Sequence, residues 1–150
     1  MRKLKLRARN FYNGEWSYGS GVVVCDDCCF LDKNDECYIQ RPYAFRGNTH
    51  FIELASTLCH KEPICLFTGL YDKNGSEIYE GDIIRSFDDK NNEILHYIEW
   101  KNSTARYVAV HISSNNLSLQ LCSDISQEWI DEFNKEIIGN IYHNPELLKK

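Results

Sequence analysis

The sequence predicts a mainly β protein, with a small barrel in residues 66–150, a β-rich segment in residues 1–65 packed on it, and one short helix. Three observations support this class. Aromatic residues make up 13% of the chain, which favours a globular protein over a disordered one. Short β-branched runs alternate with turn residues, as in antiparallel sheets. At 150 residues, the chain is long enough for one core and a smaller satellite.

The first predicted strand is basic on one face and apolar on the other. Its cations occupy every second position and alternate with apolar residues: Lys3, Lys5, Arg7 and Arg9 with Leu4, Leu6 and Ala8. Residues 1–20 contain five cations and one acid, a net charge of +4, whereas the whole chain carries −5. One interpretation is an electrostatic strip for nucleic acid or an acidic partner. The simpler interpretation, which we prefer, is a solvated face paired with acidic loops of the same chain.

The elements that follow are short. Residues 14–20 are expected to form a turn and a strand that pairs with the first strand as a hairpin, with Trp16 and Tyr18 on one face. Residues 21–24 and 37–39 are predicted as further brief strands, and the polar segment between them is predicted as a loop.

The middle of the chain, residues 44–65, gives the weakest pattern. Ile52, Leu54 and Leu58 suit a strand that becomes a short helix. Pro63 is expected to end whichever element precedes it, because the residue before a proline is restricted. We therefore expect irregular structure in this region.

The chain contains seven cysteines, an odd number without an export signal, so a disulfide framework is not expected. Cys25 and Cys28 have the spacing of half a zinc site, because two thiolates separated by two residues can face one tetrahedral ion. Completion needs Cys37 and one of Cys59, His60 or Cys65, of which we choose Cys59. The alternative is a set of free thiols, some of them buried. His60 adjoins Cys59, but adjacency along the chain does not place a base against a thiolate.

Residues 67–84 contain the densest turn chemistry of the chain. Asn74 and Gly75 can adopt positive φ, as a tight turn requires. Gly81 and Asp82 mark a second turn immediately before an apolar strand. Two turns this close together predict the entry to a small, strongly bent sheet.

Asp82 is also a candidate for a functional role. Together with Glu77 and Glu80 it forms an acidic cluster that could hold a cation or act as an acid and base. An aspartate that follows a glycine before a strand more often hydrogen-bonds its own turn. We prefer this structural role.

Three apolar runs follow, separated by polar spacers: residues 95–100, 107–112 and 117–121. They predict an antiparallel meander. A curled meander of about five strands closes most simply into a small barrel.

A short helix and a last strand are predicted at the end of the chain. Asp124 or Ser126 can cap the helix, and Asn134 or Lys135 ends it. The apolar face of the helix consists of Trp129, Ile130 and Phe133, and we expect it to lie in a conventional core. Trp100 of the preceding meander is expected in the same core. The strand spans residues 136–141 and contains Gly139, which indicates a bend or a close backbone approach. A final turn at residues 144–146 is expected to place Leu147 and Leu148 against the body.

Several segments resemble one family. These are FTGLYDKNGSEIYEGDIIR (residues 67–85), EIIGNIYHNPELL (136–148), the opening MRKLKLRARNF and GEWSYGS (14–20). Together they resemble the YopX family of phage and prophage proteins. The resemblance implies an SH3-like barrel in the C-terminal part and no established enzymatic activity. It implies no catalytic residues, and the segment from Val22 to Cys65 departs from the pattern.

The function expected from these observations is binding. The sequence contains no Gly-rich phosphate loop, Ser/His/Asp spacing or metalloprotease motif, so we do not expect an enzyme or a cofactor other than structural zinc. The leading hypothesis is a protein interaction module with an unidentified protein partner from host or phage, or with a second copy of itself. A nucleic-acid binder and a zinc-stabilised structural protein are the alternatives. The sequence contains no apolar run of membrane-spanning length, so a location in the cytoplasm of the bacterial host is expected.

Overall fold

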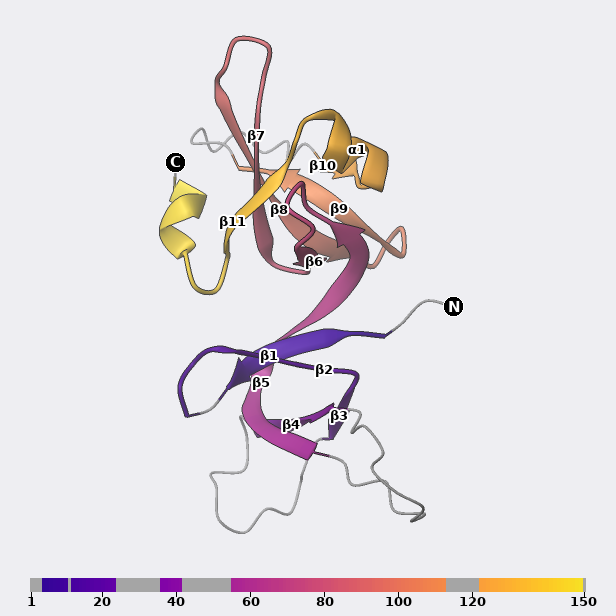
Figure 1. The fold of residues 1–150 in the computed structure, drawn as a ribbon, viewed down its shortest axis with the longest axis vertical. Helices are drawn as coiled ribbons and strands as arrows, with labels where there is room; N and C mark the ends of the chain where they lie inside the picture. The colour runs from indigo at the N-terminus through magenta and orange to yellow at the C-terminus, as the bar shows by residue number, and fades with distance from the viewer. Residues whose placement is uncertain (1–3, 11, 24–35, 42–54, 113–121, 150) are drawn as a thin grey trace. The chain divides into compact units, whose positions relative to one another are not determined.

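The computed structural model describes residues 4–10, 12–23, 36–41, 55–112 and 122–149 (Figure 1). Contacts between backbone positions divide the chain into two compact units, Met1–Leu66 and Phe67–Lys150. Strands dominate both, which confirms the predicted mainly β class. No helix among the described residues is long and apolar enough to cross a membrane.

The first unit contains a sheet in the order β2-β1-β5-β4-β3, in which all neighbours are antiparallel. Its strands are β1 (Leu6–Asn10), β2 (Trp16–Gly19), β3 (Gly21–Val23), β4 (Glu36–Arg41) and β5 (Ala55–Tyr71). The last five residues of β5 belong to the second unit. The predicted hairpin of β1 and β2 and the brief strands β3 and β4 are confirmed.

Asn10 organises the turn between β1 and β2. Its backbone N–H donates to the carbonyl of Glu15 at 2.8 Å, and its side-chain oxygen accepts from the N–H of Tyr12 at 2.9 Å. Gly14 supplies the positive φ of 70° that the turn requires. An asparagine that hydrogen-bonds its own turn is the reason the chain reverses here.

Pro63 does not end an element, contrary to the prediction, because β5 continues through it. The register with β1 changes from Ala8 opposite Ile64 to Asn10 opposite Cys59, so residues 60–63 of β5 exceed the number facing them. A proline is tolerated in such an irregularity because no ladder hydrogen bond needs its missing N–H. The predicted helix at Leu58 is also wrong, since Leu58 lies in β5 opposite Tyr38.

The second unit contains a sheet in the order β10-β9-β8-β7-β11, again antiparallel. Its elements are β6 (Glu77–Tyr79), β7 (Asp82–Phe87), β8 (Glu93–Lys101), β9 (Arg106–His111), β10 (Cys122–Asp124), α1 (Gln127–Glu132), β11 (Glu136–Asn140) and the 3₁₀ helix η1 (Pro145–Lys149). Strand β6 pairs with the end of β5. The first two runs of the predicted meander are β8 and β9, whereas the third, residues 117–121, lies outside the described residues.

This second sheet is a curled half-barrel. Its edge strands β10 and β11 are connected in sequence through α1, and no ladder joins them within the described ranges (Figure 1). The core is formed by five buried residues: Ile78, Ile84, Ile98, Ala109 and Ile130. Because Ile130 belongs to α1, the apolar face of the helix contributes to the core, as predicted. Its N-cap is Ser126, whose hydroxyl oxygen accepts from the N–H of Trp129 at 3.1 Å.

Three large residues predicted in the core are more exposed than expected. Trp100 is 38% exposed because it stands near the end of β8, where its ring meets that of Tyr107 edge-on with 5.0 Å between the centroids. Phe133 is 44% exposed and stands at the C-cap position, where its φ of −113° is no longer helical. Leu148 is likewise 38% exposed.

Candidate functional site

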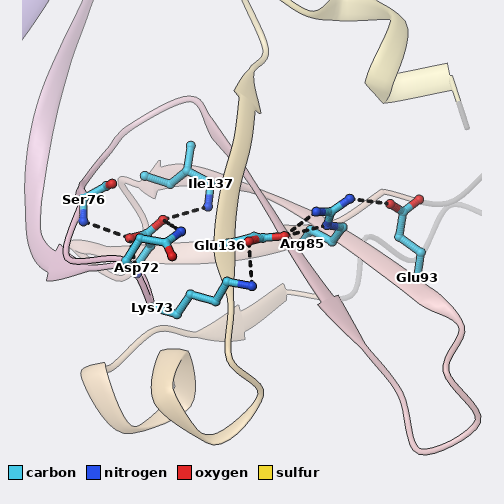
Figure 2. A network of polar contacts seen from close by, with 8 residues as sticks. Asp72, Lys73, Ser76, Arg85, Glu93, Glu136 and Ile137 are labelled. Carbon is cyan, nitrogen blue, oxygen red and sulfur yellow. Dashed lines mark hydrogen bonds and ion pairs between the residues drawn. The ribbon is translucent and has the colours of Figure 1, made fainter.

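Asp72 holds the first predicted turn together. One carboxylate oxygen, Oδ1, accepts from the backbone N–H groups of Asn74 and Ser76 at 2.8 Å each. The other, Oδ2, accepts from the N–H of Ile137 in β11 at 3.2 Å (Figure 2). Gly75 has φ of +78°, as predicted for this turn. The turn therefore also anchors β11.

The second turn is tied more tightly to the C-terminal segment. Asp82 is 1% exposed; its carboxylate accepts from the N–H of Tyr79 at 2.8 Å and from the side-chain amide of Asn140 at 3.1 Å. Gly81, with φ of +81°, donates its N–H to the carbonyl of Ile98 and accepts from the N–H of Ile141 at 2.9 Å. We call Gly81, Asp82 and Asn140 the clasp.

Glu136 of β11 forms ion pairs with basic side chains of the first turn and of β7. Lys73 approaches its Oε2 to 2.6 Å, and the guanidinium of Arg85 donates to its Oε1, with Nε at 3.0 Å (Figure 2). These hydrogen bonds, first that from Lys73, lower the pKa of Glu136, and the bond to Glu136 raises the pKa of Arg85. Arg85 also approaches Glu93 at 3.7 Å.

These polar groups are used in stabilising the fold. Asp72, Asp82 and Glu136 all bond across to another strand or turn, so the preferred structural role of Asp82 agrees with its contacts. The hydroxyl of Tyr79 donates to Glu77 at 2.7 Å. In the part of the chain that the structure describes, no three His, Cys, Asp or Glu residues are grouped so as to hold a metal ion.

The cations of the basic strand are only partly exposed to solvent. Arg7 is 6% exposed, and its guanidinium carbon lies 4.3 Å from the centroid of the Trp16 ring. Lys5 and Arg9 are half-buried, and Lys3 lies outside the described residues. Arg7 thus departs from the exposed strip that the alternation suggested, because Trp16 from the neighbouring strand covers it.

The cysteines predicted as zinc ligands divide into two groups. Cys37 and Cys59 are direct cross-strand partners in the β4–β5 ladder. Cys25 and Cys28 lie outside the described residues. His60 stands opposite Glu36, one position from the cysteine pair, so the period of two places it on the other face of the sheet from Cys59.

A buried lysine was not anticipated from the sequence. Lys135 is 2% exposed, and its Nζ donates to the carbonyl of Trp129 at 2.8 Å. The same atom lies 3.9 Å from the centroid of the Trp129 ring and 4.0 Å from that of Phe133. Burial lowers the pKa of Lys135 to about 8, while Glu132 opposes the shift. The contacts with the two rings favour the charged form.

Two histidines adjoin this lysine. His96 and His111 are cross-strand partners in β8 and β9, with ring centroids 5.4 Å apart, and the ring of His96 lies 5.5 Å from that of Trp129. Burial lowers the pKa of His96 to about 4, and the charges of His111 and Lys135 add to the effect. His96 is therefore neutral at physiological pH.

Exposed aromatic side chains flank α1. Tyr71 is 40% exposed, and both of its backbone polar groups bond to the side chain of Gln127, with its N–H donating at 3.1 Å and its carbonyl accepting at 2.9 Å. Phe133 lies at the other end of the helix, and Trp129 between them is half-buried. We call Tyr71, Trp129 and Phe133 the α1 surface.

The sequence carried only weak signals for these features. The apolar residues of α1 were visible, but nothing marked Phe133 as the exposed one. Lys135 follows the helix as an ordinary last-turn cation would, so its burial depends on rings that the fold brings around it. The α1 surface could not be predicted because Tyr71 of β5 and the helix are far apart in sequence and meet only in the fold.

Comparison with known proteins gives one family. The family model described as YopX protein matches residues 7–149. Among solved structures, the crystal structure of protein EF1440 from Enterococcus faecalis resembles this chain with a TM-score of 0.51 and 24% identity, over 97% of each chain. At this identity the likeness shows the fold alone. None of the curated proteins matches. Because the family model spans nearly the whole chain, the protein belongs to the YopX family.

Proposed function

We propose that this protein is a phage- or prophage-derived accessory protein that works as a protein interaction module and has no catalytic activity of its own. The phage origin is what the family resemblance implies. A protein of the bacterial host, whose machinery it modulates, is the partner we favour. The observation that carries the proposal is the α1 surface, where Tyr71 and Phe133 are 40% and 44% exposed.

Aromatic side chains suit this role because they bury much apolar area with few rotatable bonds. Tyrosine, tryptophan and phenylalanine are enriched in protein–protein interfaces, and tyrosine and tryptophan dominate their hot spots. The α1 surface is also preorganised: Gln127 fixes the backbone of Tyr71, and Lys135 packs against both Trp129 and Phe133. A surface that is ordered before binding loses less entropy when the partner arrives.

The polar residues of the family-like segments support the same proposal. The carboxylates of Asp72 and Asp82 each accept at least two hydrogen bonds from the protein. A general acid or base must instead reach a proton of its substrate. Groups occupied in this way serve stability, which leaves exposed apolar surface as the feature available for function.

The experiment is affinity capture from a bacterial host lysate, with and without nuclease, followed by mass spectrometry. The tagged protein is compared with the double variant Tyr71→Ser/Phe133→Ser. Hydrogen bonds from the backbone of Tyr71 to Gln127 do not depend on its ring, so this variant should fold. The matched control is Phe87→Ser, which removes a ring of 46% exposure at the end of β7.

The expected result is a stoichiometric protein partner that survives nuclease, is kept by the Phe87 variant and is lost by the double variant. A second copy of the chain captured in the same way would identify a homo-oligomer with the same surface. Capture that disappears with nuclease would contradict the proposal in favour of nucleic-acid binding. In that case, charge reversal at Lys3, Lys5, Arg7 and Arg9 should reduce affinity and its salt dependence.

A further inference from the structure

The β4–β5 ladder places two of the seven cysteines directly opposite each other. Cys37 in β4 is the register partner of Cys59 in β5, within a continuous antiparallel run from Glu36 opposite His60 to Arg41 opposite Ala55. Residues directly opposite in such a ladder share one face of the sheet. The fold thus brings together two thiol-bearing residues that are distant in sequence.

The spacing of an antiparallel ladder suits a covalent bond between them. Opposed residues have Cα atoms about 4.5 Å or about 5.5 Å apart, depending on whether the pair is hydrogen-bonded. Disulfides form across Cα separations of about 4.4–6.8 Å. The Cα separation of either kind of pair therefore lies within the range that a bridge between Cys37 and Cys59 requires.

The other cysteines in described strands stand opposite residues of other kinds. Cys65 of β5 lies opposite Arg7 and is buried, and Cys122 of β10 lies opposite Val110. Among the described strands, the ladder therefore distinguishes one pair from cysteines with ordinary neighbours. This contrast also supplies an internal control.

We propose that Cys37 and Cys59 are a thiol–disulfide pair that is oxidised by low-molecular-weight disulfides. The thiolate of one cysteine attacks a sulfur of glutathione disulfide, forms a mixed disulfide and releases one glutathione thiolate. The thiolate of the other cysteine then attacks the protein sulfur of this bond and releases the second glutathione. The chain loses two electrons and two protons; the electrons reduce one glutathione disulfide to two glutathione molecules.

The bridge would fasten the two strands that carry the longest ladder of the first unit. It closes a loop between residues 37 and 59, which restricts the unfolded chain. In a reducing compartment the pair remains as two thiols, so the bridge reports the redox state around the protein. This proposal is independent of the α1 surface, which belongs to the second unit.

The experiment titrates the full-length reduced chain with mixtures of reduced and oxidised glutathione. Samples are quenched with acid, unfolded, alkylated and mapped by proteolysis and mass spectrometry. Variants Cys37→Ser and Cys59→Ser each leave one member of the pair, and Cys122→Ser is the control that leaves the pair intact. The metal content of protein purified without chelators is measured on the same sample.

At the lowest oxidising ratio that gives any reaction, the expected product is the Cys37–Cys59 bridge, with alkylation falling from seven thiols to five. The Cys122 variant should form the same bridge. The Cys59 variant should instead accumulate glutathione on Cys37, because no second thiol is opposite to release it. A first disulfide that excludes this pair would overturn the proposal. Stoichiometric zinc that protects both thiols until it is chelated would also overturn it, in favour of the metal site.

Discussion

The two turns of residues 67–84 look alike in sequence but differ in their surroundings. Gly75 and Gly81 both have positive φ, +78° and +81°. A Cβ built on Gly75 meets nothing within 4 Å, whereas a Cβ on Gly81 lies 2.8 Å from Cε2 of Tyr142 and 3.2 Å from Nδ2 of Asn140. Glycine is therefore needed for conformation alone at the first turn, and for conformation and space at the second.

The carboxylates of the two turns also differ in where their hydrogen-bond donors come from. Asp72 accepts two bonds from its own turn, at Asn74 and Ser76, and one from β11. Asp82 accepts from the N–H of Tyr79 and from the side chain of Asn140, and it is 1% exposed against 5% for Asp72. Most donors to the Asp72 carboxylate come from its own turn, whereas the second turn is half of a clasp that the C-terminal segment completes.

The largest expected effect is that of Gly81→Val. Positive φ is strained for a β-branched residue, and the added atoms collide with Tyr142. Strain and overpacking each cost about 1–3 kcal/mol, so the loss should be about 3–5 kcal/mol and should unfold much of the second unit. Urea unfolding followed by the amide NMR signals of β7 and β8 measures it. An unchanged unfolding midpoint would contradict the clasp.

The next effect compares the two carboxylates. Asp82→Ala leaves the N–H of Tyr79 and the amide of Asn140 without their acceptor in a buried place, so the free energy of unfolding should fall by about 2–4 kcal/mol. Asp72→Ala should cost only about 1–2 kcal/mol, because water can replace the acceptor at exposed Asn74 and Ser76, and only the N–H of Ile137 loses its acceptor in a half-buried place. Equal losses in the same urea titration would contradict the difference between the turns.

A smaller effect is expected for Gly75→Ala. The site has open space, so only the left-handed conformation is penalised, at about 1–2 kcal/mol. Gly81→Ala, with the same φ and a crowded Cβ, should cost clearly more in parallel urea titrations. This pair separates conformational strain from close approach, and equal costs would show that Tyr142 and Asn140 give way.

Turn chemistry was the part of the site that the sequence predicted best. Gly75 and Gly81 have the positive φ that glycine tolerates, whereas Asn74 does not have positive φ and Asp82 is the first residue of β7. The partner of Asp82 was not predictable in this way. Asn140 lies far along the chain, and only the β7–β11 ladder brings it to the turn.

The same contrast between local and distant causes applies to the rest of the fold. Ser126 was identified as a helix cap from local chemistry, and the structure confirms it. The passage of β5 through Pro63 depends instead on a register shift opposite β1, which no local pattern reveals. Lys135 is buried because Trp129 and Phe133 lie against it, and helix periodicity did not reveal that Phe133 itself is 44% exposed.

The half-buried His96, which lies outside both turns, should make the stability of the fold depend on pH. Burial lowers the pKa of His96 to about 4, below the ordinary value of 6.5. Between these values the unfolded chain takes up a proton that the folded chain does not, so stability should fall as the pH decreases from about 6.5 to about 4. His96→Phe should weaken this dependence, while Gly75→Ala should keep it. Thermal melts across this range measure both, and an unaltered slope in the His96 variant would contradict the assignment.

The most direct test of the clasp is a double-mutant cycle between Asp82 and Asn140. The free energy of unfolding is measured for the wild type, Asp82→Ala, Asn140→Ala and the double variant, with Asp82 and Asn74 as the control pair. Direct bonding predicts a coupling energy of about 1–3 kcal/mol for the first pair and a value near zero for the control. Additive losses at Asp82 and Asn140 would contradict the claim that this contact holds residues 67–85 and residues 136–148 together.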